Sequence, residues 1–372
     1  MRTVFYKKTF IWALLALAGG CVDPYRPPEI ASPNSYLVVN GFFDSAPGAT
    51  TTISLSRSQN LTDTKAPTVE TRAVVTIESQ SKAVYTLREG TVGNYTLTGV
   101  TPLVGETYRL HVKTTKGVDY YSDYVPVNVT PPVDSVSWFE ENNGVQINVN
   151  AHDPKNNTRY YRWEYDETWE FTSAYYSLLE IKNNDIVNRT EQINRCWTGA
   201  SSKNILTTST TRLSQDVVSQ FPLTYIEGSS VKLGIRYSIL VRQMALTQAA
   251  YEYYDQLAKI TQNIGSIFDP QPSQLTGNIR AANNSSELAL GFFRVGSVTT
   301  KRLFVRNSDL HFNRITKTGY EGCVVDTLTK KDVLAQQPGI ISPYGDNGLY
   351  LTSGIGCLDC RLRGVNKRPD FW

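Results

Sequence analysis

The sequence predicts a mainly β protein made of two β-sandwich domains, the second of which contains a helical insertion. Three observations indicate this fold class. Short segments of alternating polar and apolar residues, separated by Gly, Pro, Asp and Asn, fill much of the first half of the sequence. The pair Pro131-Pro132 interrupts them and makes a joint between two groups of strands. Residues 246–264 instead repeat their apolar residues at helical spacing.

Residues 1–20 have the three-part layout of a secretory signal, with a basic start, an apolar middle too short to span a bilayer, and a small-residue end. A signal that ends in small residues directly before a cysteine is typical of a bacterial lipobox. We therefore expect Cys21 to be acylated and to hold the protein on a lipid bilayer. The alternative is a plain signal with an incidental cysteine, and Ala18 stands where a lipobox usually has leucine.

The sequence has 37 basic and 34 acidic residues, a formal charge of +3. Three of the basic residues and none of the acidic ones lie in residues 1–20, so the remainder is neutral. A nucleic-acid-binding protein needs a clustered positive surface to displace counterions, so we expect no nucleic-acid partner. Residues 21–34 contain four prolines and no periodicity, which is typical of an extended tether behind the lipidated cysteine.

Residues 35–130 predict the first sandwich, because seven strand-like segments follow one another in about a hundred residues. They are SYLVVNGFF, ATTISLSRS, RAVVTIES, AVYTLRE, NYTLTG, TYRLHVK and DYYSDYVPVNV. In TYRLHVK the apolar side chains alternate with basic ones. His111 lies on the basic face, so we expect it to point to solvent.

Residues 133–372 predict the second sandwich. SVSWFEE, GVQINVNAHD and RYYRWEYDETWEF follow the joint in an order that resembles the opening strands of fibronectin-type or immunoglobulin-like sandwiches. In the third segment Tyr161, Trp163 and Tyr165 share one face, which we expect to meet the core. Residues 171–228 mix polar stretches with few clear strands and predict an elaborated crossover.

A long strand, SSVKLGIRYSILVRQ, leads into the helical insertion. Thr247 can cap the start of the helix and Gly265 its end. Behind the helix, LALGFFRV and TTKRLFVRN predict a hairpin around Gly296-Ser297. The apolar stripe of the helix consists of Leu246, Ala250, Tyr253, Leu257, Ile260 and Ile264.

Tyr251 and Tyr254 lie off this stripe. Aromatic rings on an outer face are more typical of a contact surface than of a solvated one, so both tyrosines form a candidate interaction surface. A partner protein would dock there. The alternative, which the sequence leaves equally open, places both rings under the following proline-rich loop.

Four cysteines follow Cys21. In an exported protein an even number favours disulfides, with three possible connectivities. A zinc site of four thiolates and a redox role for C-L-D-C are alternatives. A bridge that closes a longer loop removes more denatured-state entropy, so we expect Cys323 to pair with one cysteine of C-L-D-C and the fourth to pair with Cys196. The C-terminus would then be stapled by Cys196, Cys323, Cys357 and Cys360.

The sequence contains no recognisable catalytic motif. None of its three histidines stands in a metal-ligand pair, and it has no nucleophile elbow, P-loop or dinucleotide-binding glycine fingerprint. It therefore predicts no catalytic residue, no metal ligand and no cofactor. Two carboxylates distant in sequence can still form a hydrolase site, because only their separation in space matters.

Several segments in combination resemble a known family. They are CVDPYRPP, YLVVNGFF, TISLSRS, RYSILVRQMALTQAAYEYYDQL, FDPQPSQLTGNI, LGFFRVGSVTTKRLFV and CLDCRLRGVNKRPDFW. Together they cover essentially the whole sequence after the signal, and they resemble the domain-of-unknown-function 4249 lipoproteins of Bacteroidetes-type bacteria. The resemblance implies an outer-membrane lipoprotein, often encoded beside a TonB-dependent transporter, without an established activity.

We therefore expect a non-enzymatic binding or scaffolding lipoprotein of the outer membrane, accessory to a TonB-dependent nutrient uptake system. The alternative is a surface or periplasmic hydrolase that acts on a polymer. The resemblance also implies that lipoproteins displayed on the surface of such bacteria often have several acidic residues just after the lipidated cysteine. Here only Asp23 is present, so both sides of the outer membrane stay open.

Overall fold

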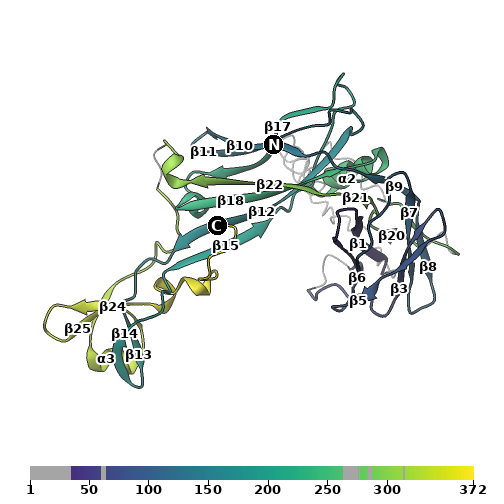
Figure 1. The fold of residues 1–372 in the computed structure, drawn as a ribbon. Coiled ribbons are helices and arrows are strands. Elements are labelled where there is room, and N and C mark those ends of the chain that lie inside the picture. Colours follow the sequence, from purple (N-terminus) through teal and green to yellow (C-terminus); the bar gives the residue numbers. More distant parts are fainter. Residues whose placement is uncertain (1–34, 60–63, 263–274, 276, 284–286, 313–314) are drawn as a thin grey trace, which may run out of the picture. The chain divides into compact units, whose positions relative to one another are not determined.

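The computed structural model describes residues 35–59, 64–262, 275, 277–283, 287–312 and 315–372. The signal, the tether and Cys21 lie outside these residues, as do Ile264 and Gly265 at the expected end of the helix. Strands predominate over helices in the described part, which confirms the mainly β class (Figure 1). No helix in this part of the protein has the length and apolar character needed to cross a membrane.

The first sandwich has strands β5, β6, β2 and β1 on one side and β4, β3, β7 and β8 on the other. Strand β9 pairs with β7 on the second side and with β21, which in turn pairs with β1 on the first side. The predicted segments therefore do form strands. Their bounds are β1 (Leu37–Asp44), β2 (Thr50–Arg57), β3 (Val74–Ser79), β4 (Val84–Thr86), β5 (Arg88–Glu89), β6 (Asn94–Thr98), β7 (Thr107–Lys113), β8 (Asp119–Ser122) and β9 (Val125–Asn128).

Three strands from much later in the sequence complete this sandwich. Strand β19 (Ile279–Ala281) pairs with β8, whereas β20 (Ala289–Leu290) and β21 (Val295–Gly296) pair in parallel with β1. Asn278, just before β19, is hydrogen-bonded to Phe293, which lies between β20 and β21. Its side-chain amide donates to the backbone carbonyl of Phe293 and accepts from the backbone N–H, at 2.8 Å each.

These strands correct two expectations. LALGFFRV does not form a hairpin with TTKRLFVRN, because Ala289, Phe293 and Val295 are buried in the first core, where Phe293 is 0% exposed. The first sandwich also extends beyond residues 35–130, since residues 279–296 belong to its sheets rather than to those of the second sandwich.

The face of β7 that was expected to be solvated is partly covered. The His111 side chain is only 16% exposed, because β8 supplies both a carboxylate and a ring beside it. Its Nε2 lies 2.8 Å from Asp119 Oδ1, and its ring stacks on Tyr121 with 4.3 Å between ring centres. The expectation of a solvent-facing His111 was therefore wrong, although the side chains of the strand do alternate between its two faces.

The second sandwich consists of two sheets. One contains β10 (Val133–Glu141), β11 (Gly144–His152) and β17 (Val217–Glu227). The other has the order β15 (Arg195–Ser201), β12 (Tyr160–Thr172), β18 (Arg236–Ala245) and β22 (Thr299–Arg306), with β16 (Leu206–Ser209) also paired to β12 (Figure 1). Asn142 and Asn143 join β10 to β11 with φ of 47° and 58°, as a two-residue type I′ turn requires.

The core of the second sandwich contains the aromatic residues expected there. Tyr161 and Trp163 are fully buried and Tyr165 is 7% exposed. The indole N–H of Trp163 donates to Gln243 Oε1 at 2.9 Å, so the ring is buried without losing its hydrogen bond. The face assignment for this strand is therefore confirmed.

Residues 171–228 are not a strand-poor crossover. They contain the last residues of β12, followed by β13 (Leu179–Lys182), β14 (Asp185–Asn188), β15, β16 and β17. Most of these strands are short and polar, which hides their alternation, and β13 and β14 form a hairpin through Asn183 and Asn184, both at positive φ.

The hairpin β13–β14 belongs to a small C-terminal subdomain. Its other elements are β23 (Asp326–Thr329), α3 (Lys330–Gln336), β24 (Gly339–Tyr344) and β25 (Leu349–Ser353). Leu179, Val333 and Ile340 form its small buried core. Four short 3₁₀ turns complete the described elements: η1 (Val231–Leu233), η2 (Asn307–Asp309), η3 (Ile355–Cys357) and η4 (Cys360–Leu362).

The helical insertion is α2 (Gln248–Gln262), which begins where the sequence predicts. The Thr247 hydroxyl accepts the backbone N–H of Ala250 at 3.2 Å and so caps the helix start. Leu246 and Ala250 are buried against Phe292. The N-terminal part of the apolar stripe therefore packs as expected, whereas Leu257 and Ile260 are only half-buried.

Candidate functional site

The structure confirms that the four late cysteines form two disulfides. Cys323 is bonded to Cys357 and Cys196 to Cys360, with Cα–Cα distances of 5.9 and 5.8 Å. This is the expected arrangement, in which Cys323 takes one cysteine of C-L-D-C and Cys196 takes the other. The zinc and redox alternatives were wrong, because neighbouring Cys357 and Cys360 have different partners and all four sulfurs are oxidised.

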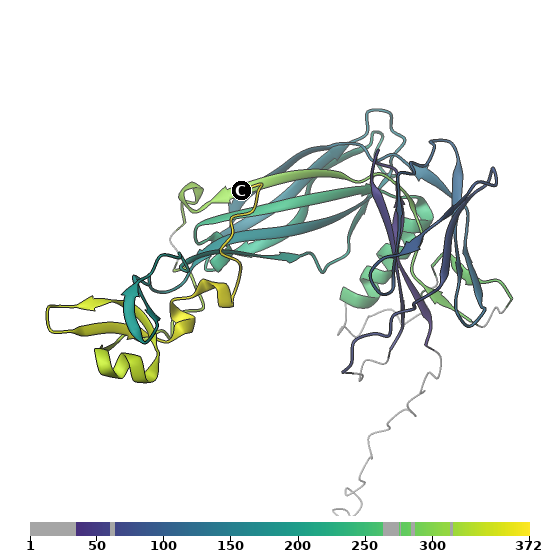
Figure 2. The ribbon, with the colours of Figure 1, turned by 60° about the horizontal axis from the view of Figure 1, so that its bottom comes forward.

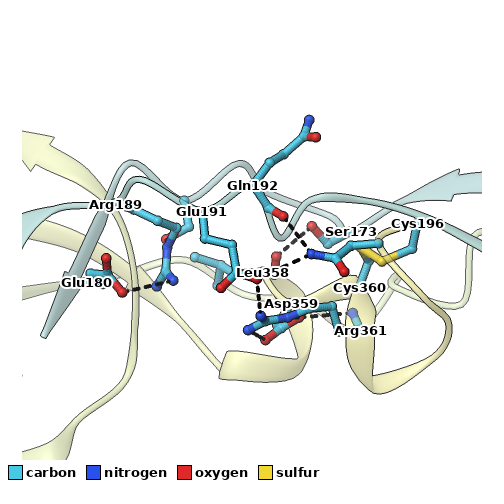
Figure 3. Close-up of polar contacts among 12 residues, drawn as sticks. Ser173, Glu180, Arg189, Glu191, Gln192, Cys196, Leu358, Asp359, Cys360 and Arg361 are labelled. Atoms are coloured by element: carbon cyan, nitrogen blue, oxygen red, sulfur yellow. Dashed lines mark hydrogen bonds and ion pairs between the residues drawn. A yellow bond between two sulfur atoms is a disulfide. The ribbon is translucent and has the colours of Figure 1, made fainter. Parts of the chain in front are cut away.

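The Cys196–Cys360 disulfide lies where three segments of the backbone meet, a region we call the neck of the C-terminal subdomain (Figure 3). The Ser173 hydroxyl donates to the backbone oxygen of Leu358 at 2.8 Å. The backbone N–H of Cys360 donates to the oxygen of Ile193, also at 2.8 Å. The neck therefore fastens the subdomain to strands β12 and β15 of the second sandwich.

Ion pairs surround the neck (Figure 3). Arg361 contacts Glu191 at 2.8 Å and Asp359 at 2.7 Å. The hydrogen bond from Arg361 lowers the pKa of the Asp359 carboxyl below its ordinary value, although partial burial opposes this effect. Arg189 lies 3.5 Å from Glu180 in the same region. Each of these carboxylates faces an arginine, an arrangement that holds separate segments together.

The C-terminal segment, residues 365–372, lies along the sheet that contains β12 and β18 (Figure 2). Val365 exchanges two backbone hydrogen bonds of 2.9 Å with Trp197 on β15. Trp372 is 8% exposed, and its indole N–H donates to Glu170 Oε2 at 3.1 Å. Its ring also contacts Phe304 edge-on, with 5.7 Å between ring centres.

A cavity of about 520 Å³ opens beside this segment, and we call it the basic cavity. Four arginines and one glutamate give its wall a formal surplus of three positive charges. The other lining side chains are uncharged. The residues that define the cavity are Glu170, Arg195, Arg236, Arg306, Arg368 and Trp372.

Glu170, Arg236 and Arg306 of this wall belong to a row of side chains on adjacent strands, which Trp197 continues beyond the cavity. Register pairs Trp197 with Glu170, Glu170 with Arg236, and Arg236 with Arg306. One residue therefore comes from each of β15, β12, β18 and β22. The two arginines stand directly opposite each other, a placement that costs stability unless an anion offsets it.

Glu170 offsets only one of these positive charges, and its closest ionic partner is Arg195. One of its oxygens accepts from Arg195 Nε and the other from the Trp372 indole. The Arg236 guanidinium lies 4.2 Å above the Phe304 ring centre, and its Nε is buried without a hydrogen bond. Within the described residues, neither Arg236 nor Arg306 forms an ion pair with a carboxylate.

Sequence reasoning missed the basic cavity. The signal that could have found it is the placement of Arg236 and Arg306 in two segments read as strands, but the register that puts them side by side is not visible in either segment alone. The C-terminal tryptophan gave no signal either, because a lone aromatic near a terminus has no periodic context.

The two tyrosines of the candidate interaction surface are half-buried against neighbouring parts of the same molecule. The Tyr251 ring lies 5.0 Å from that of Tyr160. Tyr254 packs near Phe292, and the Arg162 guanidinium lies 4.1 Å from the centre of its ring. The two residues therefore make intramolecular contacts, and docking of a partner at this edge stays a prediction.

Two further sequence predictions concern the lipid attachment and metal binding. Cys21, the expected lipid attachment, lies outside the described residues. Among the described residues, no group of three or more His, Cys, Asp or Glu side chains is arranged to hold a metal ion.

The fold is that of a mainly β protein with two sandwiches and a disulfide-held subdomain, and a basic cavity lies on the second sandwich beside the C-terminal segment. The protein belongs to the family described as Domain of unknown function (DUF4249), which matches residues 22–302. The expectation that the similarity covers essentially the whole sequence was therefore too broad: residues 303–372, with CLDCRLRGVNKRPDFW, lie beyond the match.

One solved structure similar to this protein is a two fibronectin type-III domain segment from chicken tenascin. It is 14% identical, the match covers 56% of this protein and 90% of the tenascin segment, and the TM-score is 0.15. No curated protein matches the sequence.

Proposed function

We propose that this protein is a lipid-anchored lipoprotein of the outer membrane that binds or scaffolds without catalysis and serves a TonB-dependent nutrient uptake system. The observation that carries the proposal is the start of the family match at residue 22, directly behind Cys21. Residues 1–21 thus lie outside the matched region, as expected for a signal and its lipidated cysteine.

The fold supports a binding role in two ways. Sandwich domains present their loops at the ends of rigid sheets, where recognition surfaces commonly form. The basic cavity adds a concave surface with several charged donors on one side of the second sandwich. Both features suit the capture or presentation of a ligand next to a transporter.

Metabolic labelling with an alkyne fatty acid tests the anchor. The wild-type protein should carry the label and sediment with membranes, whereas Cys21→Ser should lose both properties. Cys323→Ala/Cys357→Ala is the matched control, because it removes two other cysteines and should stay labelled. An unlabelled wild-type protein that remains in the membrane fraction would contradict the lipid anchor.

Affinity purification from the native outer membrane tests the partner. The wild-type protein should recover a TonB-dependent transporter after mild detergent extraction, and the Cys21→Ser variant should recover less because it is no longer held beside the transporter. If repeated purifications return the protein alone, while the anchor is confirmed by labelling, the accessory role fails and only the lipoprotein assignment stands.

A further inference from the structure

We infer that the basic cavity is a binding site for an oxyanion, the carboxylate, phosphate or sulfate group of an acidic ligand. The inference stands apart from the anchoring proposal, because it concerns side chains of the second sandwich and the C-terminal segment. Its starting point is the pair Arg236 and Arg306, opposite each other on β18 and β22. Opposite residues on antiparallel strands have Cβ atoms about 5 Å apart, so one anion can contact both guanidinium groups.

The charge balance favours an outside anion. Like charges at opposite positions of two strands destabilise a sheet. Arg195 and Glu170 satisfy each other, and Arg368 donates to the backbone oxygen of Trp372. The carboxylates in the described part of the protein thus leave Arg236 and Arg306 without an ion pair. A bound oxyanion would supply the missing acceptors.

The site is also held in place before any ligand arrives. Phe304 and Trp372 lie 4.2 and 5.2 Å from the Arg236 guanidinium and restrict its position. Trp372 is in turn fixed by Glu170 and Arg368. Guanidinium groups with restricted freedom lose less entropy when they bind, and their planar forks match the two oxygens of a carboxylate or phosphate.

The buried Arg236 Nε is a second and independent observation. It is a donor without an acceptor, one of six buried side-chain polar atoms without a hydrogen-bond partner in the described part of the protein, and such groups are uncommon in folded proteins. The Arg236 side chain lies on the outer face of the sheet beside the cavity, so it faces away from the core of the sandwich.

Calorimetry on the purified full-length protein in neutral detergent tests the inference with three probes: inorganic phosphate, sulfate and galacturonate. Galactose at the same concentration is the neutral control. We expect saturable one-to-one binding of at least one probe and no heat with galactose. The preferred probe identifies which oxyanion the site takes, and binding should weaken as sodium chloride is raised.

Arg306→Gln is the main variant, because its side chain is exposed and its loss should not affect folding. We expect the affinity for the anion to weaken roughly tenfold or more, because the variant loses one charge-assisted hydrogen bond. Arg280→Gln on the first sandwich removes the same charge from an exposed ion pair and should leave binding unchanged. Arg236→Gln should weaken binding similarly, with retained near-ultraviolet circular dichroism as the check on Trp372 packing.

Two results would overturn the inference. One is the absence of saturable binding for all three probes with a correctly folded protein. The other is equal weakening by Arg306→Gln and Arg280→Gln, which would indicate attraction by overall charge rather than a site. Because the protein need not be lipidated for these measurements, failure here is separable from failure of the anchor.

Discussion

Removal of the Cys196–Cys360 disulfide should destabilise the C-terminal subdomain more than removal of Cys323–Cys357. The first bridge closes 164 residues and the second 34. In the loop-entropy description these loops correspond to about 5 and about 4 kcal/mol of stabilisation, respectively. Cys196 and Cys360 are also fully buried beside Phe171, so replacing both by alanine leaves unfilled space that costs roughly a further 1 kcal/mol.

Hydrogen exchange measured by mass spectrometry can follow this difference by region. In Cys196→Ala/Cys360→Ala, the amides of β23, β24 and β25 should exchange much faster, because the neck no longer restrains the subdomain. The amides of β1 and β2 in the first sandwich should be unchanged and provide the internal control. In Cys323→Ala/Cys357→Ala the acceleration should be smaller.

The reasoning would be refuted if the Cys323–Cys357 variant lost as much protection as the Cys196–Cys360 variant, or more. It would also be refuted if neither variant changed exchange in the subdomain, since the small core around Leu179, Val333 and Ile340 would then suffice by itself.

Three further changes test other contacts. Gly291→Ala should lower the free energy of unfolding by about 2–3 kcal/mol, because φ is +119° and a Cβ would lie 2.1 Å from the Val39 oxygen; Gly48→Ala, at φ +73° in open space, should cost about 1 kcal/mol in the same urea titration. Tyr254→Leu should cost about 1 kcal/mol by removing the ring beneath Arg162, whereas weaker partner recovery at unchanged melting temperature would favour the docking surface instead. The pKa of Asp359 is lowered in the folded state, so its contribution to stability is present above the ordinary value of 3.8 and is lost as the pH falls through the lower folded-state pKa. In Arg361→Met the urea midpoint should therefore depend less on pH over that acidic range. An unchanged pH dependence would show that the ion pair contributes nothing.

Local patterns in the sequence correctly predicted local structure. The alternation of Tyr161, Trp163 and Tyr165 identified a buried face because side chains in a strand alternate with period two. The stripe from Leu246 and the cap at Thr247 located the start of α2 for a similar reason. Loop length, a property of spacing alone, predicted that Cys323 and Cys196 each take one cysteine of C-L-D-C, but not which one.

Pairings between distant segments could not be predicted in this way. LALGFFRV was correctly read as extended, but its partner β1 lies about 250 residues earlier and no spacing rule points to it. The basic cavity depends on the register of β18 against β22 and on the position of Trp372. Such features arise from three-dimensional packing, and single-strand periodicity contains no information about them.

The late strands of the first sandwich have a consequence for how the protein reaches its folded state. In the proposed export, β1 and β9 leave the export channel early, whereas β20 and β21 follow only after the second sandwich has largely appeared. Until then β1 presents an unpaired edge, and such edges attract other extended segments. We therefore expect the edge of β1 to be open to pairing with other extended segments until residues 289–296 have emerged.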